Sequence, residues 1–121
     1  EPAPDLTLPV REREATWVTA MVLQQPPGTY EGALSDGAPH GHGTIVYSDA
    51  CAAPGATLHD NSAEGLMYEG SWVAGREHGW GVLTDGADVT LYEGECAEGR
   101  LCGTGTFYFP NGDRYEGEWR D

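Results

Sequence analysis

The chain has 121 residues, of which 20 are acidic and 6 basic, giving a formal net charge of −14. This length permits one domain, and the lack of a basic stripe excludes the phosphate neutralisation on which nucleic-acid binding depends. The same deficit disfavours adsorption of this segment to an anionic membrane. We therefore expect protein partners, with basic surfaces favoured. An equal alternative is that the charge only keeps an exposed sheet soluble.

Cysteine usage and the chain ends give further expectations. Three cysteines (Cys51, Cys96 and Cys102) are too few, and odd in number, for a disulfide scaffold, so we expect a reducing, intracellular setting. The longest apolar-leaning run, residues 17–23, is shorter than the ~20 residues that span a bilayer, and no basic-plus-apolar leader is present. The chain begins with Glu1 and ends within a repeat, so we expect it to be part of a longer protein.

A short motif recurs along the chain. The tripeptide Tyr-Glu-Gly starts at four tyrosines, and in the first three copies glycine returns 7, 11 and 13 residues after the tyrosine. Such recurrence indicates stacked supersecondary units, each unable to bury its apolar face alone. The glycines predicted to be structural are Gly32, Gly43, Gly70, Gly81, Gly94, Gly105 and Gly117.

Two segments precede the repeats. Residues 1–15 are rich in proline and charge, which predicts an extended or mobile lead-in. Residues 16–28 begin with a β-branched and aromatic run and end at Pro26, Pro27 and Gly28. This pattern predicts a strand and turn that cap the open edge of the array.

The spacing of the tyrosines divides the remainder, 29–121, into three repeats and a half repeat. The first two tyrosines lie 38 residues apart, whereas the later spacings are 24 and 23. The excess places an inserted surface loop at 50–66, where turn residues are common and apolar residues few. The predicted repeats are 29–49, 67–90 and 91–114, followed by the half repeat 115–121.

Each repeat has the pattern of a β-hairpin. In the third, alternation from Leu91 to Cys96 places tyrosine, glycine and cysteine on one face and glutamates on the other. Gly99 supplies the positive φ of a tight turn, and residues 110–113 (Pro-Asn-Gly-Asp) form a second turn signal. The predicted fold is all-β, an antiparallel meander that grows by one hairpin per repeat.

Large aromatic residues recur beside the glycines. A glycine within a strand marks the close approach of another group, and we expect rings to cover glycines of the neighbouring repeat. The stripe is interpreted either as packing within the sheet or as anchors in a groove for a partner helix or strand. The candidate anchors are Tyr30, Tyr68, Trp72, Trp80, Tyr92, Tyr115 and Trp119.

These motifs resemble the MORN (membrane occupation and recognition nexus) repeat. The resemblance rests on Tyr-Glu-Gly and the later His-Gly-x-Gly or Gly-Thr-Gly, together with residues 107–119 at a repeat junction. The first repeat departs from the pattern at Ala33 and Leu34 and by its insert. The resemblance implies an elongated, twisted single-layer sheet of consecutive hairpins with a groove.

The resemblance also implies a function. Members of the family are scaffolds in axonemal, cytoskeletal and membrane-contact assemblies, and some arrays are attached to enzymes. We expect a non-enzymatic scaffold that binds proteins in a multi-subunit complex, located in the cytoplasm or cytoskeleton, with a cilium or flagellum axoneme favoured. The alternatives are a membrane-associated scaffold and a regulatory array attached to an enzyme domain outside this segment.

No catalytic, cofactor-binding or metal site is predicted. His40 and His78 occupy the turn-proximal position of the repeat, which favours a structural role. His40 and His42 alternate onto one face, but together they would need about two further ligands to hold zinc. In the third repeat the positions of Trp72 and His78 are both cysteine. We therefore predict that Cys96 and Cys102 are cross-strand neighbours, with both expected to be thiols in a reducing compartment.

Overall fold

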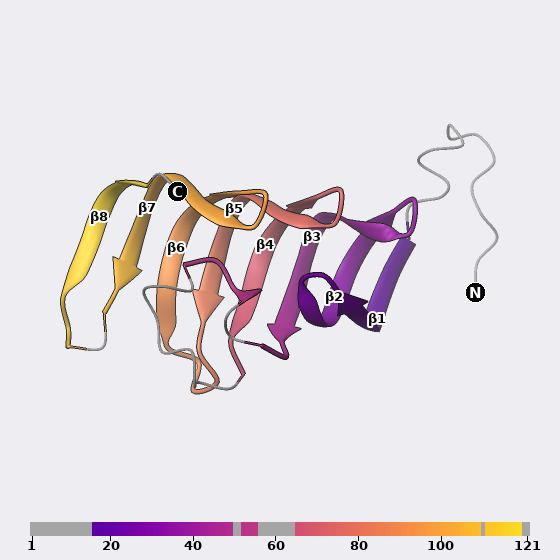
Figure 1. Cartoon of the computed structure of the whole chain (residues 1–121), viewed down its shortest axis with the longest axis horizontal. Helices are drawn as coiled ribbons and strands as arrows, with labels where there is room; N and C mark the ends of the chain where they lie inside the picture. The colour runs from indigo at the N-terminus through magenta and orange to yellow at the C-terminus, as the bar shows by residue number, and fades with distance from the viewer. Residues whose placement is uncertain (1–15, 50–51, 56–64, 110, 120–121) are drawn as a thin grey trace.

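The computed structural model describes residues 16–49, 52–55, 65–109 and 111–119. The described residues form one open sheet of eight antiparallel strands, arranged in sequence order (Figure 1). The all-β hairpin array predicted from the sequence is therefore confirmed. The predicted lead-in, 1–15, lies outside the described residues. The strands are β1 (Thr16–Gln24), β2 (Pro27–Ser35), β3 (Ala38–Tyr47), β4 (Met67–Val73), β5 (Arg76–Thr84), β6 (Thr90–Ala97), β7 (Arg100–Tyr108) and β8 (Arg114–Trp119).

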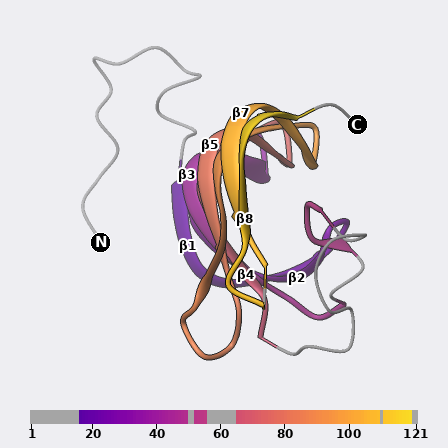
Figure 2. The same cartoon turned by 90° about the vertical axis from the view of Figure 1, so that its left-hand side faces the viewer.

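The sheet is bent into an arc, and one face forms the core. Figure 2 looks along the row of strands, which lie one behind another as a curved layer with its hollow on one side. Alternate residues of each inner strand are buried on the concave face, as period-2 side-chain geometry requires. The opposite, convex side is called the outer face below. β1 pairs with β2 along one edge of the sheet, and β8 forms the other edge.

Two-residue turns join the strands within each repeat. Both turn residues have positive φ, which is the backbone of a type I′ turn, and this turn matches the right-handed twist of the flanking strands. Glycine at the second position adopts this conformation without strain, as predicted at Gly99. The pairs are Asp36 (φ 53°) and Gly37 (79°), Ala74 (50°) and Gly75 (87°), and Glu98 (52°) and Gly99 (81°).

The seven glycines predicted to be structural form one row across the sheet. Each is the cross-strand partner of the next, from β2 to β8. A row without side chains leaves a track on the concave face in which large rings can lie against the backbone. The row is Gly32, Gly43, Gly70, Gly81, Gly94, Gly105 and Gly117.

A register shift follows the glycine pair in each repeat and corrects the prediction for the cysteines. Gly94 pairs with Gly105, but Cys96 pairs with Leu101. A step of two residues along β6 is therefore matched by a step of four residues along β7. Cys102 lies within this bulge and is not directly opposite Cys96. A β-bulge adds residues to one strand only, which simple counting back from the turn cannot reveal. Both cysteines are free thiols.

The described part of the insert also differs from expectation. The sequence predicts a surface loop over 50–66, yet Ala53 and Pro54 are buried, and Leu66 joins the same core cluster. A methyl group built on Gly55 would lie 3.0 Å from Leu101 Cδ1 and 3.6 Å from Phe107 Cε2. The segment Ala52–Gly55 therefore packs onto the concave face, because its small apolar residues gain more from burial than from exposure.

Candidate partner-binding surfaces

The repeated tyrosines cover the glycine row, but within their own hairpin. A Cβ atom on Gly81 would lie 2.2 Å from Tyr68 Cε1, so the ring occupies the space that a side chain would need. The Tyr68 hydroxyl donates to the Ser71 carbonyl at 3.0 Å. Tyr30 and Tyr92 repeat this arrangement over the second-strand glycines of their own hairpins. The expectation that tyrosines cover glycines of a neighbouring repeat was wrong, because the i+3 hydrogen bond turns each ring toward its own hairpin.

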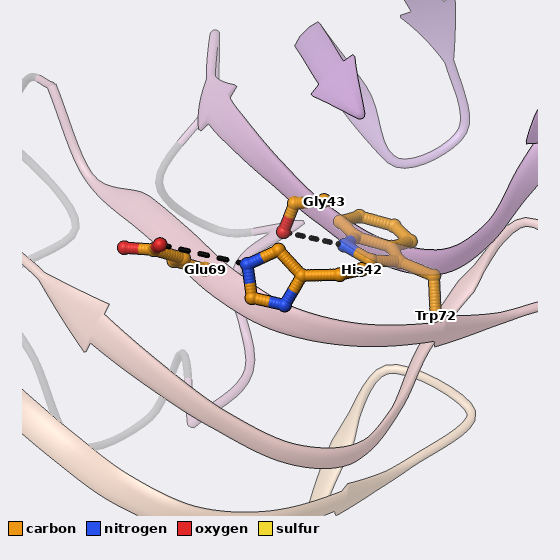
Figure 3. Close-up of polar contacts among 4 residues, drawn as sticks. All are labelled: His42, Gly43, Glu69 and Trp72. Carbon is orange, nitrogen blue, oxygen red and sulfur yellow. Dashed lines mark hydrogen bonds and ion pairs between the residues drawn. The ribbon is translucent and has the colours of Figure 1, made fainter. Parts of the chain in front are cut away.

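Tryptophans make the contact between repeats instead. Trp72 Nε1 donates to the Gly43 carbonyl at 3.0 Å, across the boundary between the first and second repeats (Figure 3). Its indole lies edge-on between Tyr30 and Tyr68, with ring centroids 5.2 and 5.5 Å away. Trp119 makes the corresponding bond to Gly105 in the third repeat at 3.1 Å. Tyrosines therefore close each hairpin, and tryptophans join the first repeat to the second and the third repeat to the half repeat.

The candidate anchors fall into three groups by exposure. Tyr30, Tyr68, Trp72 and Tyr92 are buried in the core cluster and serve packing within the sheet. Burial raises the pKa of Tyr30 to about 12, so its hydroxyl stays a donor at neutral pH. Trp119 is half-buried against that cluster. The remaining two anchors are accessible to a partner: Tyr115 is 46% exposed on β8, and Trp80 is 55% exposed.

Sequence reasoning missed a polar cluster within the core. Glu77 is 1% exposed, and the Tyr47 hydroxyl donates a hydrogen bond to its Oε2 atom. Burial raises the pKa of the Glu77 carboxyl, opposed by the bond from Tyr47 and by the charge of Arg76. Burial also raises the pKa of the Cys96 thiol to about 12, so it is protonated and a poor nucleophile at neutral pH. The sequence does carry a signal for this cluster. Glu77 is a charged residue at an inward position, and the corresponding positions of the other repeats hold Pro39 and Leu101.

The outer face carries a row of acidic side chains. Tyr-Glu-Gly places one exposed glutamate per repeat on this face, and cross-strand pairing aligns them with a small residue between each pair. Successive glutamates are two strands apart, about 10 Å. We call Glu31, Glu69, Glu93 and Glu116 the glutamate row; Thr44, Val82 and Thr106 stand between them.

Trp80 and the histidines lie beside this row. Trp80 pairs across strands with Glu95, so an exposed indole stands among carboxylates on the outer face. His42 Nε2 lies 3.5 Å from Glu69 Oε2 on the same face (Figure 3). His40 Nδ1 accepts the Ala74 N–H at 3.3 Å, which ties the first repeat to the next hairpin turn.

Within the described ranges no three histidine, cysteine, aspartate or glutamate side chains are placed to hold a metal ion. His78 is exposed on β5. No helix of the described part is long and apolar enough to cross a membrane. The accessible and chemically distinctive residues include the glutamate row and three exposed aromatic rings, Trp17, Trp80 and Tyr115.

Comparison with known proteins supplies a family for this architecture. The chain matches the MORN repeat at residues 30–51, 68–86, 92–114 and 115–121. Over 97 residues, 77% of the chain, it is 29% identical to alsin of Homo sapiens and of Mus musculus. Over the same length it is 42% identical to alsin of Rattus norvegicus. The chain spans 5% of the length of each of these relatives.

Proposed function

The chain belongs to the MORN repeat family, and from this premise we propose that it is a non-enzymatic scaffold that binds other proteins. MORN repeats form modules for protein interaction or membrane association. The proposal selects the first of these roles and assigns it to the outer face, where the glutamate row meets a basic surface of a partner. The partner belongs to a larger multi-subunit assembly.

The outer face is the observation that carries this proposal. Four glutamates stand in register about 10 Å apart, and they repel an anionic membrane while attracting a basic protein surface. An exposed tryptophan is a typical hot-spot residue in protein interfaces. Trp80 is exposed on the same face, next to the glutamate row and opposite Glu95. The net charge of −14 acts in the same direction. Together these features favour a protein partner over a lipid surface.

A charge-reversal experiment tests the assignment. Immobilised wild-type chain is compared with the variant Glu69→Lys/Glu93→Lys in affinity capture from cell extract, followed by mass spectrometry. The control, Asp88→Lys/Glu98→Lys, changes the net charge equally at two exposed residues of the connecting turns and leaves the glutamate row unchanged. We expect proteins that the wild type and the control retain and the Glu69/Glu93 variant loses. Equal capture by all three proteins would refute the use of this face.

Sedimentation with phosphatidylserine vesicles tests the membrane alternative. The proposal predicts that the wild-type chain stays in the supernatant at about 0.1 M salt, where screening still leaves surface charge effective over roughly 10 Å. Pelleting of the wild type with these vesicles, and not with neutral ones, would favour membrane association instead.

The cellular setting stays a prediction of its own. We propose the cytoplasm or cytoskeleton, with a cilium or flagellum axoneme as the favoured assembly, on the strength of the family resemblance alone. Imaging of the tagged protein in ciliated cells tests this location. The chain covers a small part of the alsins that it matches, which keeps open a second role as a repeat array attached to further domains. The full-length sequence decides that point.

A further inference from the structure

The concave face of the third repeat is occupied by another part of the same chain. The segment 52–55 lies on the hollow side of the curved sheet (Figure 2). Pro54 is among the most completely buried side chains of the protein, and Ala53 is 4% exposed. Gly55 approaches Leu101 so closely that an added methyl group would lie 3.0 Å from its Cδ1 atom. This contact is a packed interface and not a loose covering.

The occupied site coincides with a break in the tryptophan series. Trp72 and Trp119 each fill the concave face at a repeat boundary and donate to a glycine carbonyl. The residue in that position at the boundary between the second and third repeats is Cys96, whose side chain is much smaller than an indole. Cys96 pairs across strands with Leu101, the residue that Gly55 approaches. The segment 52–55 therefore lies beside the position that a tryptophan fills at the other two boundaries.

The ends of the inserted segment are attached to the sheet. The Tyr47 N–H donates to the Leu66 carbonyl at 2.9 Å, which brings the two ends of the connection together. The Tyr47 hydroxyl reaches across to Glu77. These bonds hold the base of the insert independently of Ala52–Gly55. The attachment of the base therefore does not depend on the contact that residues 52–55 make with the concave face.

We propose that the concave face around Cys96, Leu101 and Phe107 is a docking site for an uncharged, proline-containing apolar segment of a partner protein. The protein's own segment Ala52–Gly55 is the intramolecular occupant of this site and competes with that partner. The inference goes beyond the proposed function, because it concerns the opposite face and does not depend on the glutamate row.

The chemistry of the occupant defines the ligand class. Ala52–Gly55 carries no charge, and its proline restricts the unbound backbone, which lowers the entropy lost on binding. The floor of the site is formed by the apolar side chains of Leu101 and Phe107. A charged segment would leave its charge desolvated against this floor, which is strongly unfavourable. Small apolar residues next to proline therefore fit, and acidic or basic residues do not.

Tethering sets the strength of the competition. A segment joined to its own site by a short stretch of chain has an effective concentration of roughly 1 mM. For an external peptide with a Kd near 0.1 mM, a tethered copy of equal affinity reduces apparent binding about tenfold. The site is therefore closed to weak ligands and open to tighter ones.

A peptide-binding experiment tests the proposal. In the shortened variant a brief Gly-Ser linker replaces residues 50–64, which removes the occupant; circular dichroism and thermal denaturation establish that it is folded. The probe is a fluorescent synthetic peptide of residues 50–55 with Cys51→Ser and blocked ends, which carries no charged side chain. The control peptide carries Pro54→Asp in addition. Fluorescence anisotropy measures binding of both peptides to the shortened and the intact chain.

The proposal predicts that the probe binds the shortened variant about tenfold more tightly than the intact chain, and that the Pro54→Asp peptide binds neither. Should the shortened variant fail to fold, the substitution Ala53→Asp in the intact chain expels the segment and takes its place in the comparison. Equal binding to open and closed proteins, or no saturable binding below about 5 mM, overturns the proposal. These outcomes are independent of whether the outer face binds a protein.

Discussion

Substitution of Gly81 by alanine tests how the tyrosine rings hold the sheet. The new Cβ atom would lie 2.2 Å from Tyr68 Cε1 and 2.3 Å from Cζ and Oη. Carbon atoms are in favourable contact at about 3.5–4.0 Å, so the overlap exceeds 1 Å. The strand has no room to retreat, because Gly81 pairs with Gly70 and Gly94 on its two sides. The Tyr68 ring must leave its site.

The structure allows the cost to be worked out. Displacing the ring breaks the hydroxyl bond to the Ser71 carbonyl and the edge-on contact with Trp72 at 5.5 Å. Removal of a large buried ring costs about 3–5 kcal/mol, and partial relaxation recovers some of it. We expect Gly81→Ala to reduce the free energy of unfolding by about 3 kcal/mol, a large part of the 5–15 kcal/mol typical of a domain.

A double-mutant cycle isolates the steric cause. Urea denaturation followed by tryptophan fluorescence gives the free energy of unfolding for the wild type, Gly81→Ala, Tyr68→Ala and the double variant. In the Tyr68→Ala background, Gly81→Ala meets no ring. It should then raise the free energy of unfolding by about 0.5 kcal/mol, because alanine lowers the entropy of the unfolded chain. The account predicts a coupling of about 3 kcal/mol between the two sites. Additive effects within about 0.5 kcal/mol would refute the role of Tyr68 as the group that excludes a side chain at position 81.

Three further substitutions follow from the same structure. Burial raises the pKa of Glu77 above 4.5, so its contribution to stability is complete below that pH and declines as pH rises through the raised value. As pH rises from about 4 to 8, the free energy of unfolding measured with urea should therefore fall less steeply for Glu77→Gln than for the wild type. Parallel curves of unfolding free energy against pH would contradict this. Ala74 has a φ of 50°, so Ala74→Gly should raise the free energy of unfolding by about 0.5–1 kcal/mol, and a loss would contradict the strain. Trp72→Phe leaves the Gly43 carbonyl without its donor and should cost about 1–3 kcal/mol, whereas the exposed control Trp80→Phe should change stability by less than about 0.5 kcal/mol; equal effects would argue against the bond.

The hairpin order was predictable because it depends on local, repeating signals. Glycine at fixed distances from tyrosine fixes both the turns and the alternation, so the succession of antiparallel strands follows from the sequence alone. The direction of the Tyr68 ring did not follow, since it depends on a hydrogen bond to the Ser71 carbonyl. The offset of Cys102 from Cys96 also escaped, because a bulge changes the pairing without changing the composition.

The insert and the buried carboxyl could not be located for a different reason. Ala52–Gly55 has no periodicity, and its place on the concave face depends on packing against Leu101, which lies far along the chain. Glu77 carries a local sign, a charge at an inward position, but its partner Tyr47 lies 30 residues away. Long-range complementarity of this kind is expressed in three dimensions and leaves no fixed spacing in the sequence.

Carboxyl footprinting of the bound protein tests the central claim that the outer face binds a partner protein. Carbodiimide labelling is measured for the chain alone and in complex with a protein recovered by the wild type. The account predicts that Glu69 and Glu93 lose most of their labelling in the complex, while the exposed turn residue Glu98 labels equally in both states. Unchanged labelling of Glu69 and Glu93 in a stable complex would contradict the account and place the partner elsewhere on the protein.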